Sequence, residues 1–215
     1  AVFASTPGVR RHFCPVCGTP MAYEGDRWPH EIHFFAATLD DAAAYRPTAH
    51  VNWNEHLPWV RLADGLPVHY TPRRLTGTED MGPILNLIRD AFAYMDGIVD
   101  PPSSVHDLTG AGLAEAARAG EVWVIDEVGA PLACMALTPK PGRLYVGKLA
   151  VAAGHRRKGL ARQLLAHAEL RAKTLGLPLL EMQSRVELTG NHGAFEAMGF
   201  VRAGEPAHPG YDRPT

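Results

Sequence analysis

The sequence has few cysteines, no long apolar run and no excess of charge of either sign. Only three of its 215 residues are cysteine. Two of these stand in one C-x-x-C, which makes no disulfide framework, so a reducing cytoplasm is the expected location. No apolar run approaches the roughly 20 residues that cross a bilayer, and the first residues carry no signal-peptide pattern. The net charge of −2 predicts no nucleic-acid or membrane partner.

The sequence has the composition of a globular protein, and two regions of it differ in residue pattern. The hydrophobic share of 46% and the charged share of 20% are typical of a soluble globular protein. Prolines and tryptophans crowd the first third, which predicts short strands and turns, with residues 32–36 as a strand. Asp64-Gly65 and two nearby prolines predict a boundary at residues 66–72. We therefore expect a small β-rich module at 1–70 and a second domain at 71–215.

The second domain alternates helical and strand patterns. Apolar residues recur at helical spacing in several segments, and short β-branched runs separate them. The predicted helices are 79–94, 113–119, 158–175 and 191–198. The predicted strands are 122–125, 132–137, 144–151, 179–183 and 200–204. The long third helix should end at Gly176, since Pro178 cannot continue it.

The most informative junction is LYVGKLAVAAGHRRKGLARQLL, residues 144–165. A predicted strand runs through a short loop into the long helix, whose first turn follows three consecutive cations. Unpaired N–H groups and the positive end of the dipole make such a helix start an anion site. The small residues Gly159 and Ala161 would let a phosphate approach the backbone. A solvated basic run at a helix start is the alternative that spacing alone leaves open.

Two motifs carry a family resemblance. R-x-x-G-x-A, at Arg156, Gly159 and Ala161, resembles the acetyl-CoA signature of the GNAT superfamily of N-acetyltransferases. Asn191 to Phe200 resembles the N-x-x-A-x-x-x-x-G-F segment of the same family, and the order of elements over residues 70–210 also agrees. The resemblance implies an α/β (α+β) GNAT acyl-CoA N-acyltransferase fold, with a mixed, mostly antiparallel sheet flanked by helices. It also implies direct transfer of acetyl from acetyl-CoA to a primary amine.

The resemblance further implies site residues. The pantetheine arm of acetyl-CoA would lie in a slot between the signature strand and the next strand, and the pyrophosphate at the helix start. Cofactor-binding residues would be Leu149, Ala150, Val151, Arg156, Arg157, Lys158, Gly159, Leu160, Ala161, Asn191 and Phe195. The acceptor would meet the loop between the first two helices through Tyr94, Asp96, Asp100 and Ser103. That acceptor is a small-molecule amine or a peptide amine.

The sequence departs from the family at the proton donor. The family's usual tyrosine lies four residues before the G-F pair, where this chain has Phe195, which cannot give a proton. Another group could protonate the thiolate, or solvent could suffice. The tyrosine candidates are Tyr94, Tyr145 and Tyr211. Glu181, or Glu187 in the following loop, is the candidate general base. A catalytically silent CoA-binding or interaction protein therefore stays an open alternative.

The segment Phe13-Cys14-x-x-Cys17-Gly18 resembles part of another family. It is similar to the distal half of the glutathione-dependent formaldehyde-activating (centromere protein V) family, over residues 1–70. There this pair completes a structural zinc site begun by a C-x-C pair, and other cysteines hold a catalytic zinc. This sequence starts just before the segment and has neither group, so a zinc-dependent glutathione-adduct lyase is the weakest alternative. Cys14 and Cys17 form an incomplete zinc site, to be completed by histidines or a second chain.

One further expectation concerns the C-terminal end. The GNAT family usually has a final strand after the segment that corresponds to residues 210–215, where this sequence stops. The resemblance therefore implies a missing edge strand and an exposed partner edge. Such an edge would favour association, so a homodimer is one possible assembly.

Overall fold

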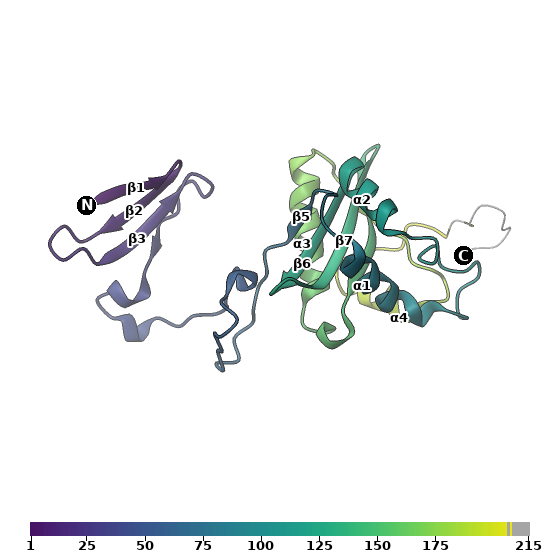
Figure 1. The fold of residues 1–215 in the computed structure, drawn as a ribbon, viewed down its shortest axis with the longest axis horizontal. Coiled ribbons are helices and arrows are strands. Elements are labelled where there is room, and N and C mark those ends of the chain that lie inside the picture. The colour runs from purple at the N-terminus through teal and green to yellow at the C-terminus, as the bar shows by residue number, and fades with distance from the viewer. Residues whose placement is uncertain (206, 208–215) are drawn as a thin grey trace. The chain divides into compact units, whose positions relative to one another are not determined.

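The computed structural model describes residues 1–205 and 207. Tyr211 and the segment 210–215, after which the resemblance implies a missing edge strand, lie outside these residues. The chain divides into two compact units, Ala1–Thr48 and Ala49–Thr215 (Figure 1). Residues 49–70 pack with the second unit, and the module boundary that the sequence predicts at 70/71 stays a prediction.

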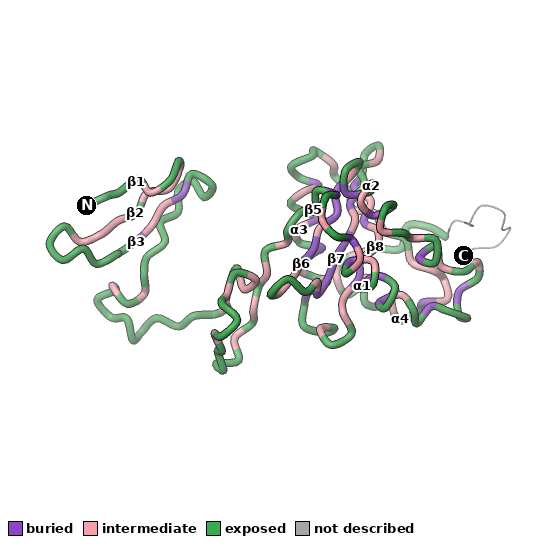
Figure 2. The backbone as a smooth tube through the Cα atoms, viewed as in Figure 1, coloured by how far each residue is buried: buried purple, intermediate pink, exposed green. Residues whose placement is uncertain are grey.

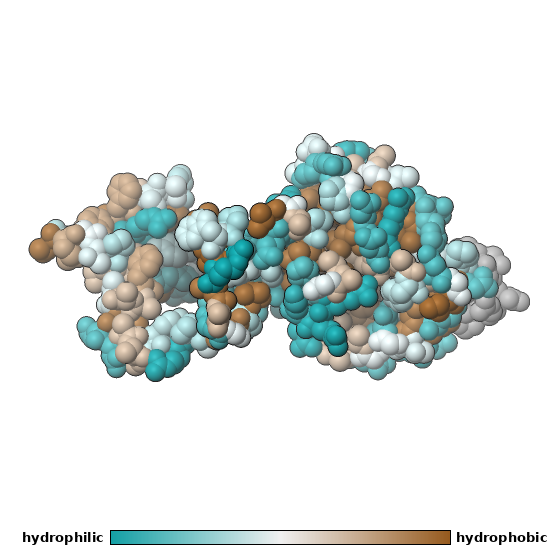
Figure 3. Space-filling view, turned by 60° about the horizontal axis from the view of Figure 1, so that its bottom comes forward, coloured by the Kyte–Doolittle hydropathy of each residue, from teal (hydrophilic) through white to brown (hydrophobic). Residues whose placement is uncertain are grey.

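The first unit is a four-stranded antiparallel sheet in the order β1-β2-β3-β4. Its strands are β1 (Val2–Thr6), β2 (Val9–Phe13), β3 (Pro20–Gly25) and β4 (His33–Phe34). The β-rich module is thus confirmed, although the strand predicted at 32–36 is only two residues long. Among its residues only Ala22 and Gly25 are buried (Figure 2). Hydrophobic side chains such as Phe3 and Phe34 are exposed in this unit. Figure 3 shows in brown where hydrophobic residues reach the molecular surface.

The second unit is built on a five-stranded sheet in the order β5-β6-β7-β8-β9. Strands β5 to β8 pair with one another in antiparallel fashion, whereas β9 pairs parallel to β8. The sheet is therefore mixed and mostly antiparallel, as predicted. The strands are β5 (Arg73–Leu75), β6 (Glu121–Glu127), β7 (Ala130–Lys140), β8 (Arg143–Val151) and β9 (Leu180–Glu181).

Helices cover both faces of this sheet. The neighbours Val124 and Ile125 on β6 are both fully buried but belong to opposite cores, as the alternation of a strand requires. One core includes residues of α1 and α2, and the other includes residues of α3. The helices are α1 (Gly82–Phe92), α2 (Gly110–Ala119), α3 (Leu160–Thr174) and α4 (Thr189–Glu196).

The last predicted strand, 200–204, is wrong. These residues form no strand, and Val201 is 85% exposed. Phe200 instead closes the end of α4, because its N–H donates to the carbonyl of Phe195. Its ring packs against the core that contains α3. Phe200 is anchored by its ring, but residues 201–204 are exposed and pair with no strand. The β-like sequence pattern of this segment therefore does not correspond to a strand.

The segment 49–70 is fastened to the second unit by polar contacts. Both Trp53 Nε1 and Tyr70 Oη donate to the carboxylate of Glu127, at 3.0 and 3.2 Å. The side chain of Gln163, on α3, accepts from the N–H of Tyr70 and donates to the carbonyl of Val68. Burial first, and then the charge of Glu127, raise the pKa of Tyr70 to about 12. Glu127 is therefore the central acceptor that holds this segment.

Replacing Glu127 by leucine is expected to loosen the segment 49–70 without unfolding the sheet. Two part-buried donors, Trp53 Nε1 and Tyr70 Oη, would lose their acceptor, at a cost of about 1–3 kcal/mol each when left unpaired. Limited proteolysis should then cut within 49–70 at least several-fold faster than in the wild type. Glu169→Leu, at an exposed position on α3, is the control. Equal cleavage rates in both variants would contradict the role of Glu127.

Candidate active site

The edge of β8 is open along its second half. β8 pairs with β9 only at Leu144–Leu180 and Tyr145–Glu181, yet it continues to Val151. Beyond Tyr145 the ladder ends among the described residues, so the backbone of residues 147–151 has no strand partner on that side. This stretch, which we call the open edge, offers backbone groups without a strand partner to an extended ligand. It contains Leu149, Ala150 and Val151, as the sequence predicts for the pantetheine arm.

A β-bulge distorts β8 at the same place. Cys134 on β7 faces Ala150, but Ala136 faces Gly147, so the register shifts between them. Two residues of β8, Lys148 and Leu149, thus face Met135 alone on β7, and Lys148 has a left-handed φ of +50°. Its side chain reaches the loop 93–109 between α1 and α2, where Nζ lies 3.4 Å from Ser104 Oγ. Sequence reasoning did not single out Lys148, because no motif marks a bulge.

The loop after β8 turns sharply into α3. Arg157 and Gly159 both have left-handed backbones, with φ of +62° and +83°, and α3 starts at Leu160. A Cβ added at Gly159 would meet no heavy atom within 4 Å. The space beside Gly159 is thus open, and the first N–H groups of α3 have no intrahelical acceptor. The residues present therefore fit an anion such as a diphosphate.

Of the three cations in this loop, Arg156 is engaged by backbone carbonyls, and its role at the cofactor stays a prediction. Its Nη2 donates to the carbonyl of Ala91, at 3.2 Å, and its Nε to the carbonyl of Val151, at 3.5 Å. These bonds tie the loop to the end of α1. Arg157 and Lys158 are exposed, as is Arg156, but the guanidinium of Arg156 is engaged by these two carbonyls. Arg157 and Lys158 are therefore the side chains available to an anion at the start of α3.

A hydrogen bond links α4 to the loop 93–109. Asn191 Nδ2 donates to Tyr94 Oη at 2.8 Å. Tyr94 belongs to the short 3-10 turn Ala93–Met95 that follows α1. A predicted cofactor residue and a predicted acceptor residue are thus brought together. Phe195 instead packs edge-to-face on Phe200, with ring centroids 6.2 Å apart.

The sequence that forms this strand, loop and helix matches the model of a known protein family. The model of the acetyltransferase (GNAT) family matches residues 84–200, which span α1 to α4. The chain belongs to the GNAT family. The predicted GNAT fold is therefore confirmed. No curated protein matches the sequence.

Solved structures show the same GNAT fold. A transcriptional regulator from Bacillus halodurans has a TM-score of 0.51 and 19% identity, covering 64% of this chain and 97% of that one. A GNAT family acetyltransferase from Elizabethkingia anophelis with acetyl-CoA bound has a TM-score of 0.50 and 19% identity, covering 67% and 86%. An aminoglycoside acetyltransferase from an uncultured soil metagenomic sample has the same score and identity, covering 67% and 97%.

Within this GNAT domain the nominated catalytic residues lie at the paired end of β8. The carboxylate of Glu181 contacts Lys140 Nζ at 3.4 Å and Arg143 Nε at 2.5 Å. Lys140 Nζ also lies 3.9 Å from the ring centroid of Tyr145, and burial, with the charge of Glu181, raises the pKa of Tyr145. Tyr145 stands about 13 Å before Leu149 at about 3.3 Å per residue. The ring of Tyr145 nevertheless lies beside Gly147, at the start of the open edge, whereas Glu181 is held between two cations. The catalytic roles of both residues stay predictions.

The predicted acceptor residues lie in the loop 93–109, where hydrogen bonds and ion pairs engage several of them. Asp96 pairs with His106 at 2.9 Å. Ser103 Oγ accepts from the N–H of Val105 at 3.4 Å, and the N–H of Asp100 donates to Glu187 on the segment between β9 and α4 at 3.4 Å. The carboxylate of Asp96 is therefore engaged, and Glu187 joins the two loops.

The first unit holds Cys14 and Cys17 in the turn between β2 and β3. The N–H of Gly18 donates to the carbonyl of Cys14 at 2.9 Å. A hydrogen bond with Thr19, at 3.1 Å, is the main cause of a lowered pKa of the Cys17 thiol. Within residues 1–205 and 207, no three His, Cys, Asp or Glu side chains are grouped to hold a metal ion. Zinc at this pair thus stays a prediction without support from a ligand set.

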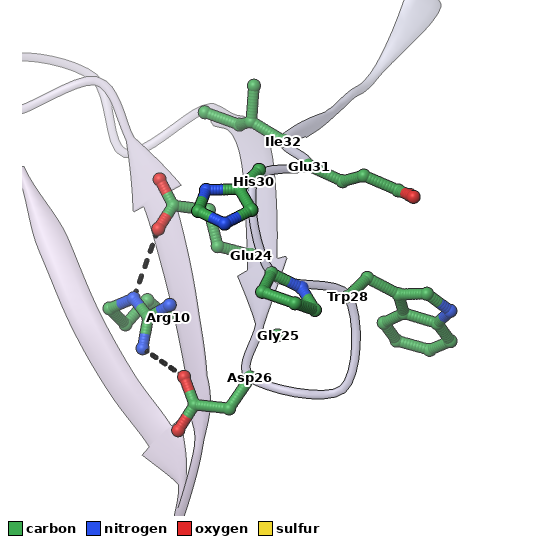
Figure 4. A pocket seen from close by; sticks show the side chains of 9 residues that line it. Arg10, Glu24, Gly25, Asp26, Trp28, His30, Glu31 and Ile32 are labelled. Atoms are coloured by element: carbon green, nitrogen blue, oxygen red, sulfur yellow. Dashed lines mark hydrogen bonds and ion pairs between the residues drawn. The ribbon is translucent and has the colours of Figure 1, made fainter. Parts of the chain in front are cut away.

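The same unit contains a shallow pocket of about 620 Å³ beside Trp28. Across it Arg10 donates to Glu24 Oε2 at 3.0 Å and to Asp26 Oδ1 at 2.8 Å (Figure 4). Its guanidinium is thus already engaged by two carboxylates and is not free to bind an anion in this pocket. The described residues of both units include no helix long and apolar enough to cross a bilayer.

Proposed function

We propose that this protein transfers the acetyl group of acetyl-CoA to a primary amine, which attacks the thioester directly. The observation that carries the proposal is the continuity of the open edge of β8 with the loop at Gly159 and the start of α3. An extended arm and an anionic group need these two features side by side. Two structures of the same fold support the choice of substrates, since one holds acetyl-CoA and the other is an aminoglycoside acetyltransferase.

Each part of the proposed site has a distinct task. Backbone groups of Leu149 and Val151 would bond the pantetheine arm, and one N–H there would stabilise the oxyanion that forms as the amine attacks. Backbone N–H groups from Arg157 to Ala161 would hold the diphosphate, helped by the side chain of Lys158. Acetyl-CoA supplies an activated acyl carbon. The protein supplies proximity and proton transfer.

The rival function is a catalytically silent CoA-binding protein, which the packing of Phe195 on Phe200 favours. The two differ in the release of free thiol from acetyl-CoA. A panel of simple amines, amino acids, aminoglycosides and peptide N-termini should contain at least one acceptor that accelerates thiol release above the rate without acceptor. Cofactor binding with no acceleration by any acceptor would favour the silent protein.

A further inference from the structure

Lys148 combines three unusual features at the open edge. It is a non-glycine residue with a left-handed φ of +50°, and lysine is not among the residues that tolerate that region well. It stands in a bulge, a feature that re-aims side chains and is frequent beside active sites. It immediately precedes Leu149. A strained conformation beside a binding site is a reason to examine the side chain for function.

The environment of the Lys148 ammonium is poor in charge. The side chain is partly buried, and this desolvation lowers its pKa. Lys148 Nζ donates a hydrogen bond to Ser104 Oγ, at 3.4 Å. On β7, Cys134 Sγ lies 3.8 Å from the Lys148 carbonyl and is itself buried. In the facing loop, Asp96 is paired with His106. The ion pairs of the described residues do not include Lys148.

We propose that Lys148 accepts the proton of the acceptor ammonium and passes it to solvent through Ser104. Ser104 is exposed, so it connects a partly buried amine to bulk water. The side chain of Lys148 points from the open edge into the loop 93–109, where the acceptor is expected. Glu181, the carboxylate nominated from the sequence, lies instead between two cations at the paired end. The inference rests on the proposed acetyl transfer.

The proton balance of the reaction is consistent with one amine in this position. The acceptor enters as an ammonium and ends as a neutral amide, so it loses two protons. Neutral Lys148 takes the first, which leaves through Ser104, and the amine then attacks the acyl carbon. As the carbon–sulfur bond breaks, Lys148 takes the second proton and returns it to the thiolate. The last step needs no tyrosine at the position of Phe195.

The first test measures the protonation of Lys148 without turnover. The chain has four lysines, Lys140, Lys148, Lys158 and Lys173, so 13C-dimethylated lysines give a spectrum that can be assigned by single Lys→Arg variants. The Lys148 signal should titrate at lower pH than that of Lys173, which is exposed at the end of α3. Titration of both together would overturn the proposal, whether or not acetyl-CoA binds.

The second test is kinetic. Lys148→Arg keeps the positive charge but cannot lose its proton, so kcat/KM should fall about 100-fold or more. The plateau of the wild-type pH profile should become a continuous rise with pH. Lys173→Arg is the matched control and should behave as the wild type. Unchanged acetyl-CoA binding in Lys148→Arg would show an intact site, and an unchanged pH profile would overturn the proposal.

The two tests also separate this inference from the proposed function. A wild-type protein that fails to bind acetyl-CoA would contradict acetyl transfer, and with it the assigned role of Lys148. Binding and turnover combined with an ordinary Lys148 titration would contradict only the role of Lys148.

Discussion

Substituting Gly159 by glutamate is expected to abolish the rise in melting temperature that acetyl-CoA gives the wild-type protein. Gly159 has a φ of +83° and open space where a Cβ would stand. A glutamate there would place bulk and negative charge at the start of α3, where the diphosphate is proposed to bind. At about 100 times Kd a ligand stabilises by about 2.7 kcal/mol, which corresponds to about 5–10 °C for a domain of this size. Thermal unfolding with and without acetyl-CoA measures the difference.

The control for this prediction is Gly129→Glu. Gly129 lies in the turn between β6 and β7, has a φ of +80°, and likewise has no heavy atom within 4 Å of an added Cβ. Both variants therefore carry the same backbone strain and the same charge. Gly129→Glu should lose some stability and keep the full shift with acetyl-CoA. A shift of wild-type size in Gly159→Glu would refute the proposed position of the diphosphate.

The sequence predicts the elements of the GNAT domain well because their signals are local. Leu164, Leu165 and Ala168 recur at helical spacing, and all three are buried in one core. The signature at Arg156 to Ala161 likewise needs only a strand, a loop and a helix start in sequence. Such patterns are set by residues that are near one another in the chain.

The parts that sequence does not predict depend on distant contacts. The bulge at Lys148 is a mismatch between two strands, visible only when Cys134 and Ala136 are paired with their partners. The side chain of Arg156 has the right type for a phosphate, but the carbonyl of Ala91, 65 positions earlier, lies within its reach. The segment 49–70 has turn composition, yet Glu127 and Gln163 hold it against the second unit.

The charge network at Glu121 also depends on residues that are distant in the sequence. It is the basis of the second prediction with a large effect, which concerns stability. Glu121 is the buried charged residue of the described chain, at 7% exposure. Its carboxylate accepts from Arg171 Nε at 3.0 Å, from Arg171 Nη2 at 2.5 Å and from Trp123 Nε1 at 2.8 Å. The hydrogen bonds from Arg171 are the main cause of a lowered pKa of Glu121, followed in the same direction by Trp123. Strand β6 and helix α3, which lie 50 positions apart at Glu121 and Arg171, thus meet at one carboxylate.

Arg171→Met is expected to destabilise the protein by about 3 kcal/mol at neutral pH, because it leaves a buried carboxylate without its main partner. Since the folded pKa of Glu121 is lowered below 4.5, the pair stabilises fully above that pH and loses its effect as pH falls through the folded value. The destabilisation should therefore shrink in acid. Glu121→Gln combined with Arg171→Met should recover part of the loss, since an amide oxygen still accepts from Trp123.

The exposed pair Arg118–Glu115, with side chains 51% and 68% exposed, supplies the control for this effect. Arg118→Met removes this exposed pair and the hydrogen bond from Arg118 Nη1 to the carbonyl of Gly77. It should change stability by only about 1 kcal/mol, since water already solvates both charges and no buried charge is left unpaired. Denaturant unfolding of the three variants at neutral and acidic pH would separate the two cases. Equal losses from Arg171→Met and Arg118→Met, or a loss from Arg171→Met that does not vary with pH, would contradict a buried carboxylate that depends on Arg171.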